Sequence, residues 1–203
     1  MQTNTVLVGA DPELFMRNPN TGSFVSAHEF ESGQRIPGTK WEPYKVPYGA
    51  VQVDGTALEF NIDPAHTVDE FVHNLNAVRQ TLRDMVPGYN VVAEPVAFFD
   101  ETYFEDKVPA VARELGCNPD YNGWTQKTNP QPDPGGKAFR TASGHLHIGW
   151  TQDADEMDHE HFLFCCKVAR QLDYALGVPS LLWDQDNTRR ELYGKAGAFR
   201  PKS

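Results

Sequence analysis

Residues 51–62 read Val-Gln-Val-Asp-Gly-Thr-Ala-Leu-Glu-Phe-Asn-Ile, and this stretch decides the fold class. Apolar and polar residues alternate on both sides of Asp54-Gly55, which predicts strands at Val51–Val53 and Ala57–Ile62. Asp-Gly between two strands is typical of a type I′ turn, because both central residues of that turn need positive φ. The stretch therefore predicts an antiparallel β-hairpin.

The rest of the chain adds more strands and two helices. Further strands are expected at Thr5–Val8, Leu14–Met16, Val91–Phe98 and His145–Trp150. The strands and helices do not alternate regularly along the chain, as they would in a parallel α/β fold. We therefore expect an α+β fold with a largely antiparallel sheet.

The first helix is predicted after residue 67, where Thr67 and Glu70 form a capping box. Its apolar residues recur at helical spacing until Pro87-Gly88 stops the pattern. They are Phe71, Leu75, Val78 and Leu82.

The second helix is expected from about Ala154, with Asp153 and Glu156 placed to cap it, and Gly177 and Pro179 ending it. Its apolar stripe, which we expect to be core, consists of Phe164, Val168 and Leu172.

Length and composition predict one soluble globular domain. The 203 residues are 39% hydrophobic and 23% charged, and the net charge is −10. Such a charge repels nucleic acid and anionic membranes. No apolar run approaches the roughly 20 residues that span a bilayer, so we expect a cytoplasmic protein, as a monomer or small homo-oligomer. Cys117, Cys165 and Cys166 match no disulfide framework or zinc motif, and we expect reduced, mostly buried thiols.

Three strand segments carry groups that bind metals. Asp11 and Glu13 flank Pro12, Glu59 projects opposite Leu58 and Phe60 with Asp54 nearby, and His145 and His147 share one face of their strand, about 7 Å apart. Leu146, Ile148 and Trp150 then face the core. The combination suits Mg²⁺ or Mn²⁺. Solvated residues on the wet face of a half-exposed sheet explain the same spacing, so both interpretations stay open.

A basic segment stands out near the C-terminus of an otherwise acidic chain. It contains Arg189, Arg190, Lys195 and Arg200, with Gly194 and Gly197 among them. Arginines bind phosphate oxygens bidentately, and glycines let the backbone approach such a ligand. The segment is either an anion site or a basic surface loop. Two other charged stretches, His159–His161 and Asp100–Asp106, are expected to lie on the surface.

Five stretches together resemble a known family. They are Gly9–Phe15, Pro37–Lys40, Gly49–Phe60, Gly144–Gly149 and Tyr193–Arg200. In this order and spacing they resemble the phage-type carboxylate-amine ligases, or amidoligases, of the glutamine synthetase-like fold. The resemblance runs through nearly the whole chain and implies a single ligase domain over residues 1–203.

The resemblance implies a curved, mostly antiparallel sheet with helices packed on one face. It also implies an enzyme that uses ATP and Mg²⁺ or Mn²⁺ to join a small-molecule or peptide carboxylate to an amine through an acyl phosphate. The location implied is the host cytoplasm if the gene is a phage gene. The family usually adds an E-x-R segment on a late strand, and this chain ends at Phe199–Ser203 before any such strand.

The resemblance assigns a role to each matching residue. The metal ligands it implies are Asp11, Glu13, Glu59 and His145. The residues it implies for ATP or substrate binding are His147, Arg189, Arg190, Lys195 and Arg200, with Arg190 and Arg200 as the catalytic arginines. These parts suit phosphoryl transfer, which depends on positioning and charge neutralisation.

Two other functions fit parts of the same pattern. A metal-dependent hydrolase would use His145, His147 and carboxylates to activate water, without a nucleotide. A non-catalytic module of the same fold would bind nucleotide or metal without turnover.

Overall fold

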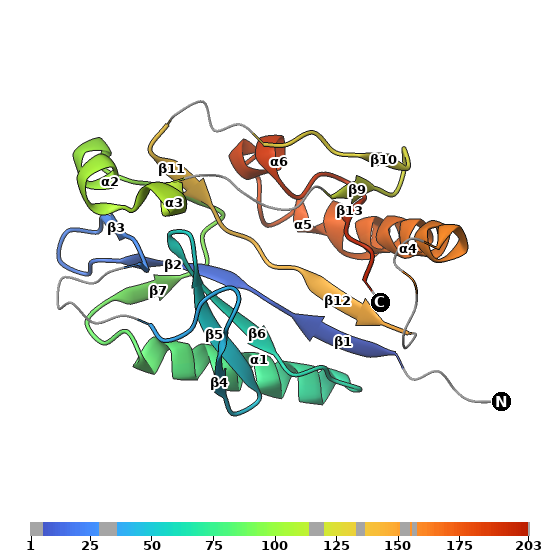
Figure 1. Ribbon diagram of the computed structural model, residues 1–203, viewed down its shortest axis with the longest axis horizontal. Coiled ribbons are helices and arrows are strands. Elements are labelled where there is room, and N and C mark those ends of the chain that lie inside the picture. Colours follow the sequence, from blue (N-terminus) through green and yellow to red (C-terminus); the bar gives the residue numbers. More distant parts are fainter. Residues whose placement is uncertain are drawn as a thin grey trace. The chain divides into compact units, whose positions relative to one another are not determined.

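The computed structural model describes residues 6–28, 36–113, 120–132, 137–150, 155 and 158–202. The chain forms two compact units. The first contains Met1–Glu114 and Gly136–Trp150, and the second contains Leu115–Gly135 and Thr151–Ser203. Each unit is mixed α and β (Figure 1).

A curled antiparallel sheet forms the centre of the first unit (Figure 1). Its strands follow the order β3-β2-β6-β5-β4, and β7 also pairs with β2. Their bounds are β2 (Glu13–Arg17), β3 (Phe24–Val25), β4 (Tyr44–Val46), β5 (Gly49–Asp54), β6 (Ala57–Ile62) and β7 (Asn90–Val92). All the pairings are antiparallel, which confirms the predicted fold class at this level.

The predicted hairpin is the β5–β6 pair, but its turn differs from the prediction. Asp54 pairs with Ala57, so the two central residues are Gly55 and Thr56. Gly55 has a φ of 58°, whereas Thr56 does not lie at positive φ, so the turn is not type I′. Asp54 is consequently the last residue of β5 rather than a turn residue.

β1 (Leu7–Ala10) leads into β2 through Asp11 and Pro12, and the segment from Ser143 to β12 (Leu146–Gly149) runs beside both. β1 pairs with β12, and beyond it the backbone N–H groups of Asp11 and Glu13 donate to the carbonyls of His145 and Ser143. The predicted burial of Leu146 is wrong, since it is 43% exposed. Among the described strands β12 pairs with β1 alone, and an edge strand leaves its apolar positions less covered.

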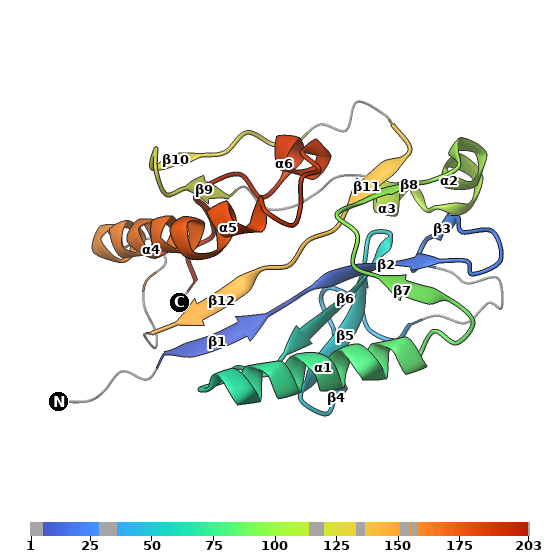
Figure 2. The same cartoon turned by 180° about the vertical axis from the view of Figure 1, so that it is seen from behind.

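α1 (Val68–Asp84) covers one face of the sheet, as Figure 2 shows from behind. The Thr67 hydroxyl accepts a hydrogen bond from the Glu70 N–H, and the Glu70 carboxylate accepts one from the His66 N–H. This confirms the predicted N-terminus. Val78 and Leu82 of α1 are fully buried in one core cluster with alternate residues of the hairpin. Those hairpin residues are Val51, Leu58, Phe60 and Ile62.

A second apolar cluster lies on the opposite face of β2. It contains Phe15 and Ala57 together with Phe99 and, from α2 and α3, Phe104 and Ala112. The bounds of its elements are β8 (Val96–Phe98), α2 (Glu101–Lys107), α3 (Ala110–Arg113) and β11 (Phe139–Thr141), and β8 pairs with β11 (Figure 2). Helices therefore contact both faces of the sheet, not one as expected.

The single strand predicted over Val91–Phe98 is two strands. β7 ends at Val92 and pairs with β2, and β8 begins at Val96 and pairs with β11. Pro95 between them has no N–H to donate to a ladder, which favours a break there. The acidic residues of α2 are exposed, as predicted.

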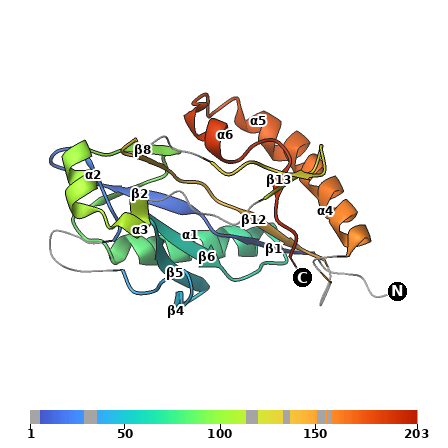
Figure 3. The same cartoon turned by 45° about the horizontal axis from the view of Figure 1, so that its top comes forward.

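The second unit consists of short strands and a helical segment (Figure 3). Its elements are β9 (Tyr121–Asn122), β10 (Lys127–Thr128), α4 (His159–Leu172), η1 (Asp173–Gly177), α5 (Val178–Ser180), α6 (Thr188–Leu192) and β13 (Ala198–Phe199). β9 pairs with both β10 and β13.

α4 differs from the predicted helix at both ends. It begins at His159, and the Asp158 carboxylate caps it, whereas Asp153 and Glu156 lie outside the described residues. Helical backbone continues past Gly177 and Pro179, because proline fits the first turn of α5.

The buried face of α4 also differs from the predicted stripe. It consists of Cys165, Cys166 and Ala169, whereas Phe164 is 47% exposed. Cys165 and Cys166 are free thiols, as expected, and Cys117 lies outside the described residues. Across the described chain, every helix is too short or too polar to cross a membrane.

Gly38 lies in the loop before β4, where the backbone approaches the sheet closely. Gly88, between α1 and β7, is a matched glycine without such neighbours. Both have left-handed φ, 94° and 91°, but a Cβ on Gly38 would meet the Val51 carbonyl oxygen and lie 2.6 Å from the Tyr44 nitrogen, whereas one on Gly88 would have no atom within 4 Å. We expect Gly88→Ala to lower the free energy of unfolding by about 1–2 kcal/mol and Gly38→Ala by at least about 3 kcal/mol. Urea unfolding measures both. Equal losses would contradict the close approach.

Candidate functional site

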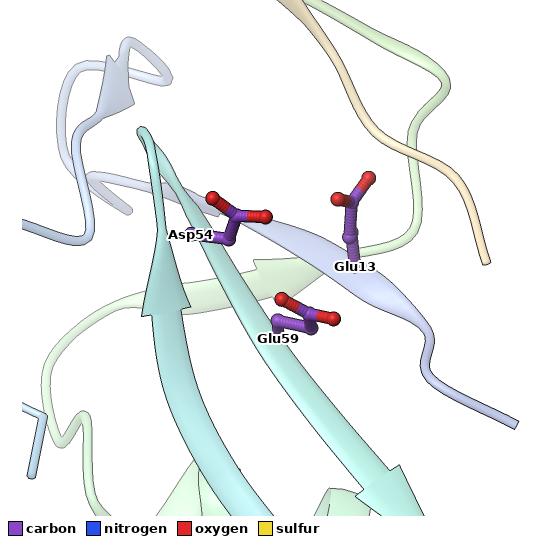
Figure 4. Close-up of side chains that lie close together, drawn as sticks. All are labelled: Glu13, Asp54 and Glu59. Atoms are coloured by element: carbon purple, nitrogen blue, oxygen red, sulfur yellow. The ribbon is translucent and has the colours of Figure 1, made fainter. Parts of the chain in front are cut away.

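Three carboxylates from the strands β2, β5 and β6 lie together on one side of the sheet. One oxygen from each of Glu13, Asp54 and Glu59 lies within 4.8 Å of the others (Figure 4). Strand pairing explains the grouping, because Glu13 pairs with Glu59 and Glu59 pairs with Gln52, two residues before Asp54. Paired residues and residues i and i+2 share one face of a sheet. We call these three residues the acidic cluster.

Each carboxylate of the acidic cluster accepts one hydrogen bond from a different donor. The Ser143 N–H donates to Glu13 Oε2 over 2.7 Å, Gln52 Nε2 to Glu59 Oε2 over 2.6 Å, and Lys40 Nζ to Asp54 Oδ2 over 2.7 Å. Within the described chain, the second oxygen of each carboxylate has no hydrogen-bond donor. One oxygen of each carboxylate is therefore open to a ligand.

The environment raises the pKa values of two members of the acidic cluster, Glu13 and Glu59. Burial raises the pKa of Glu13 to about 7, and the charges of Glu59 and Asp54 add to the effect while the Ser143 N–H opposes it. Burial also raises the pKa of Glu59, with Asp54 and Asp11 adding to it and the Gln52 hydrogen bond opposing it. Burial lowers the pKa of Lys40, but its hydrogen bond and charge interaction with Asp54 outweigh this and raise it. The charged forms of Glu13 and Glu59 are therefore disfavoured, a cost that a nearby positive charge would offset.

Gln52 supplies a fourth oxygen beside the acidic cluster. The residue is 5% exposed, and its Oε1 is buried without a hydrogen-bond donor among the described residues. Its Nε2 must face Glu59 Oε2, because exchanging the two amide atoms would place oxygen against oxygen. A buried oxygen without a partner costs about 1–3 kcal/mol, which a bound cation would offset.

The predicted metal ligands divide into two groups. Glu13 and Glu59 belong to the acidic cluster, whereas Asp11 and His145 bind each other. Asp11 Oδ1 lies 3.0 Å from His145 Nδ1, and Asp11 Oδ2 lies 3.1 Å from His147 Nε2. The Asp11 carboxylate also accepts the His145 N–H over 2.8 Å. Asp11 therefore holds two imidazoles, whose ring centres are 6.4 Å apart on one face, as strand alternation predicts.

Asp11 remains electrostatically linked to the acidic cluster. Burial alone would raise the pKa of Asp11, but hydrogen bonds from His145 and His147 and the charge of His145 outweigh it and hold the pKa well below its usual range. The charge of His145 acts on Glu13 and that of Asp11 acts on Glu59. The side chains of His145 and His147 are 50% and 53% exposed, so a ligand from solvent can reach both.

The predicted phosphate-binding residues lie in the second unit. Arg190 donates to the Asp184 carbonyl over 2.7 Å and to the Asp184 carboxylate over 3.0 Å. Arg189 lies against Gly194, whose φ is 65°. Lys195 begins the turn before β13, and Arg200 directly follows β13. Both residues are partly buried. The anion-binding role of these four residues stays a prediction.

Sequence patterns indicated Asp54 only as a neighbour of Glu59, and they indicated no role for Gln52. Both could have been found from one signal, since Gln52 and Asp54 alternate with Val51 and Val53 and so share a face. Lys40 appeared only within Pro37–Lys40, and its contact with Asp54 is long-range. The Ser143 N–H is a backbone group without a sequence signal.

No family model matches the chain, and neither a curated protein nor a solved structure is significantly similar to it.

The raised pKa of Glu13 predicts how Glu13→Gln changes stability with pH when a chelator removes metal ions. The folded protein binds more protons than the unfolded chain between the ordinary pKa of 4.5 and about 7, so charge at Glu13 costs stability as pH rises through that range. Relative to the wild type, we expect Glu13→Gln to gain about 1–3 kcal/mol between about pH 4.5 and about pH 8, then level off. Chemical denaturation across this range measures the difference.

Glu105→Gln is the control for this experiment, because Glu105 is an exposed carboxylate of α2. We expect it to change stability by less than about 0.5 kcal/mol at every pH. A pH-independent difference between Glu13→Gln and the wild type would contradict the buried, charge-crowded environment of Glu13.

Proposed function

We propose that this protein is an ATP- and divalent-metal-dependent ligase that joins a carboxylate to an amine through an acyl phosphate. The observation that carries the proposal is the acidic cluster on the antiparallel sheet, two of whose members are the metal ligands that the sequence resemblance implies. The substrates proposed are a small-molecule or peptide carboxylate and an amine.

The donor set fits Mg²⁺ or Mn²⁺. Glu13, Asp54 and Glu59 offer carboxylate oxygens and Gln52 offers an amide oxygen, which are the ligands that hard divalent cations prefer. When bound, such a cation neutralises the phosphate oxygens of ATP during phosphoryl transfer. The Ser143 N–H and Gln52 Nε2 hold two of the carboxylates in place by hydrogen bonds to one oxygen each.

The imidazoles beside the cluster have a second role in this proposal. Asp11 contacts both rings through its two carboxylate oxygens, which fixes the spacing of the rings. Exposed imidazoles in this position bind the polar part of a substrate or of ATP, as the resemblance implies for His147. A hydrolase whose metal is held by both histidines is the alternative function, and the assay below distinguishes it from the ligase.

Purified protein incubated with ATP, Mg²⁺ or Mn²⁺ and a panel of amino acids and peptides tests the proposal. We expect phosphate and ADP release that depends on both a carboxylate and an amine. Glu13→Ala and Glu59→Gln should each lower the rate about 100-fold or more, because each removes a cation ligand. Glu105→Gln should retain the wild-type rate.

The other functions give different outcomes in the same assay. Hydrolysis of an amide or ester without ATP, stimulated by Zn²⁺ and lost in His145→Ala, would favour the hydrolase. Calorimetric ATP binding without turnover would favour the non-catalytic module. Phosphate release unaffected by Glu13→Ala and Glu59→Gln would overturn the proposed site.

A further inference from the structure

Lys40 is the only lysine in the described chain that contacts the acidic cluster. Its Nζ lies 2.7 Å from Asp54 Oδ2, and 48% of its side chain is exposed. No second acceptor for the ammonium lies among the described residues, so two of its three N–H donors are available to solvent or a ligand.

The backbone around Lys40 holds it beside Asp54. Thr39 and Glu42 exchange backbone hydrogen bonds of 3.0 Å each, which closes a tight turn around Lys40. Thr39 also forms a β-bridge with Val53, the residue before Asp54. Gly38 enters this turn at a φ of 94° against the backbones of Val51 and Tyr44, where a side chain does not fit. The position of Lys40 therefore follows from packed backbone rather than from a mobile surface loop.

Gln52 is an independent observation that points to a ligand at the acidic cluster. Its buried Oε1 lacks a donor in the described part of the chain although its Nε2 binds Glu59. A cation that binds this oxygen and the three carboxylates also needs Asp54, whose Oδ2 the Lys40 ammonium occupies. Asp54 Oδ1 is open among the described residues, but two positive charges on one carboxylate repel each other, so lysine and cation compete for the negative charge of Asp54.

A divalent cation in such a site keeps open positions that anionic oxygens fill. An ammonium displaced from Asp54 by one cation lies next to those positions on its flexible four-carbon stem, and it then has three N–H donors to offer. An anionic oxygen between the cation and the ammonium is attracted by both charges.

We propose that Lys40 is an anion-binding residue of this site, held on Asp54 until a divalent cation takes that carboxylate, and that its ammonium then pairs with an anionic oxygen of the cation's ligand. This inference rests on the proposed function, for which it names a phosphate or carboxylate contact. Lys40 would thus make cation binding weaker and anion binding to the loaded site stronger.

Calorimetry on the full chain tests the proposal with two probes, Mn²⁺ alone and inorganic triphosphate at saturating Mn²⁺. We expect Lys40→Met to bind Mn²⁺ at least about 3-fold more tightly, because a competing charge is gone, and triphosphate about 10-fold or more weakly. Lys40→Arg should retain triphosphate binding closer to that of the wild type. Lys107→Met, at an exposed lysine of α2, is the matched control and should change neither affinity.

The outcomes separate this proposal from the proposed function. Mn²⁺ binding that is lost in Glu59→Gln but unchanged in Lys40→Met, together with unchanged triphosphate binding, overturns the role of Lys40 and leaves the metal site standing. Tighter Mn²⁺ binding with unchanged triphosphate binding overturns the anion contact. A wild-type protein that does not bind Mn²⁺ overturns both. Thermal denaturation of Lys40→Met and a second variant, Lys40→Gln, verifies that the affinities belong to folded protein.

Discussion

The burial of two carboxylates that face each other across neighbouring strands, with their mutual repulsion as a smaller contribution, sets the electrostatics of the candidate site. Glu13 of β2 and Glu59 of β6 occupy paired positions, and Asp54 lies at the end of the next strand. Like charges at paired positions destabilise a sheet. A backbone N–H, an amide and an ammonium each bind one carboxylate and offset part of that cost. What remains unoffset raises the pKa values of Glu13 and Glu59, and together with the unbonded Gln52 oxygen it is the physical reason for proposing a cation at the cluster.

Asp11 and Pro12 separate β1 from β2, and they lie between the pair of imidazoles and the acidic cluster. Pro12 has no N–H, and Gly144 packs against it so closely that a Cβ there would stand 3.2 Å from Pro12 Cα. On either side of Pro12, the carboxylates of Asp11 and Glu13 accept the N–H groups of His145 and Ser143, in place of carbonyl oxygens. One strand junction therefore orients both the imidazole pair and the acidic cluster.

Much of the candidate site followed from alternation along single strands. That Glu59 lies opposite Leu58 and Phe60, and that His145 and His147 share a face, are consequences of the two-residue period of β-structure. The partners of these residues did not follow, because they depend on register. A type I′ turn at Asp54-Gly55 would have paired Val53 with Thr56, whereas the turn at Gly55-Thr56 pairs Gln52 with Glu59 and keeps Asp54 in the strand.

Short-range patterns were sufficient for α1, for the β-hairpin and for the antiparallel character of the sheet, since capping, helical spacing and alternation involve residues a few positions apart. Long-range contacts decided the rest. The segment Val91–Phe98 forms two strands because its two ends pair with different partners. The buried residues of α4 are Cys165, Cys166 and Ala169 rather than the predicted stripe. Long-range contacts also explain why Asp11 does not join Glu13 and Glu59 in the acidic cluster. Its carboxylate contacts His145 and His147, which lie more than 130 positions along the chain.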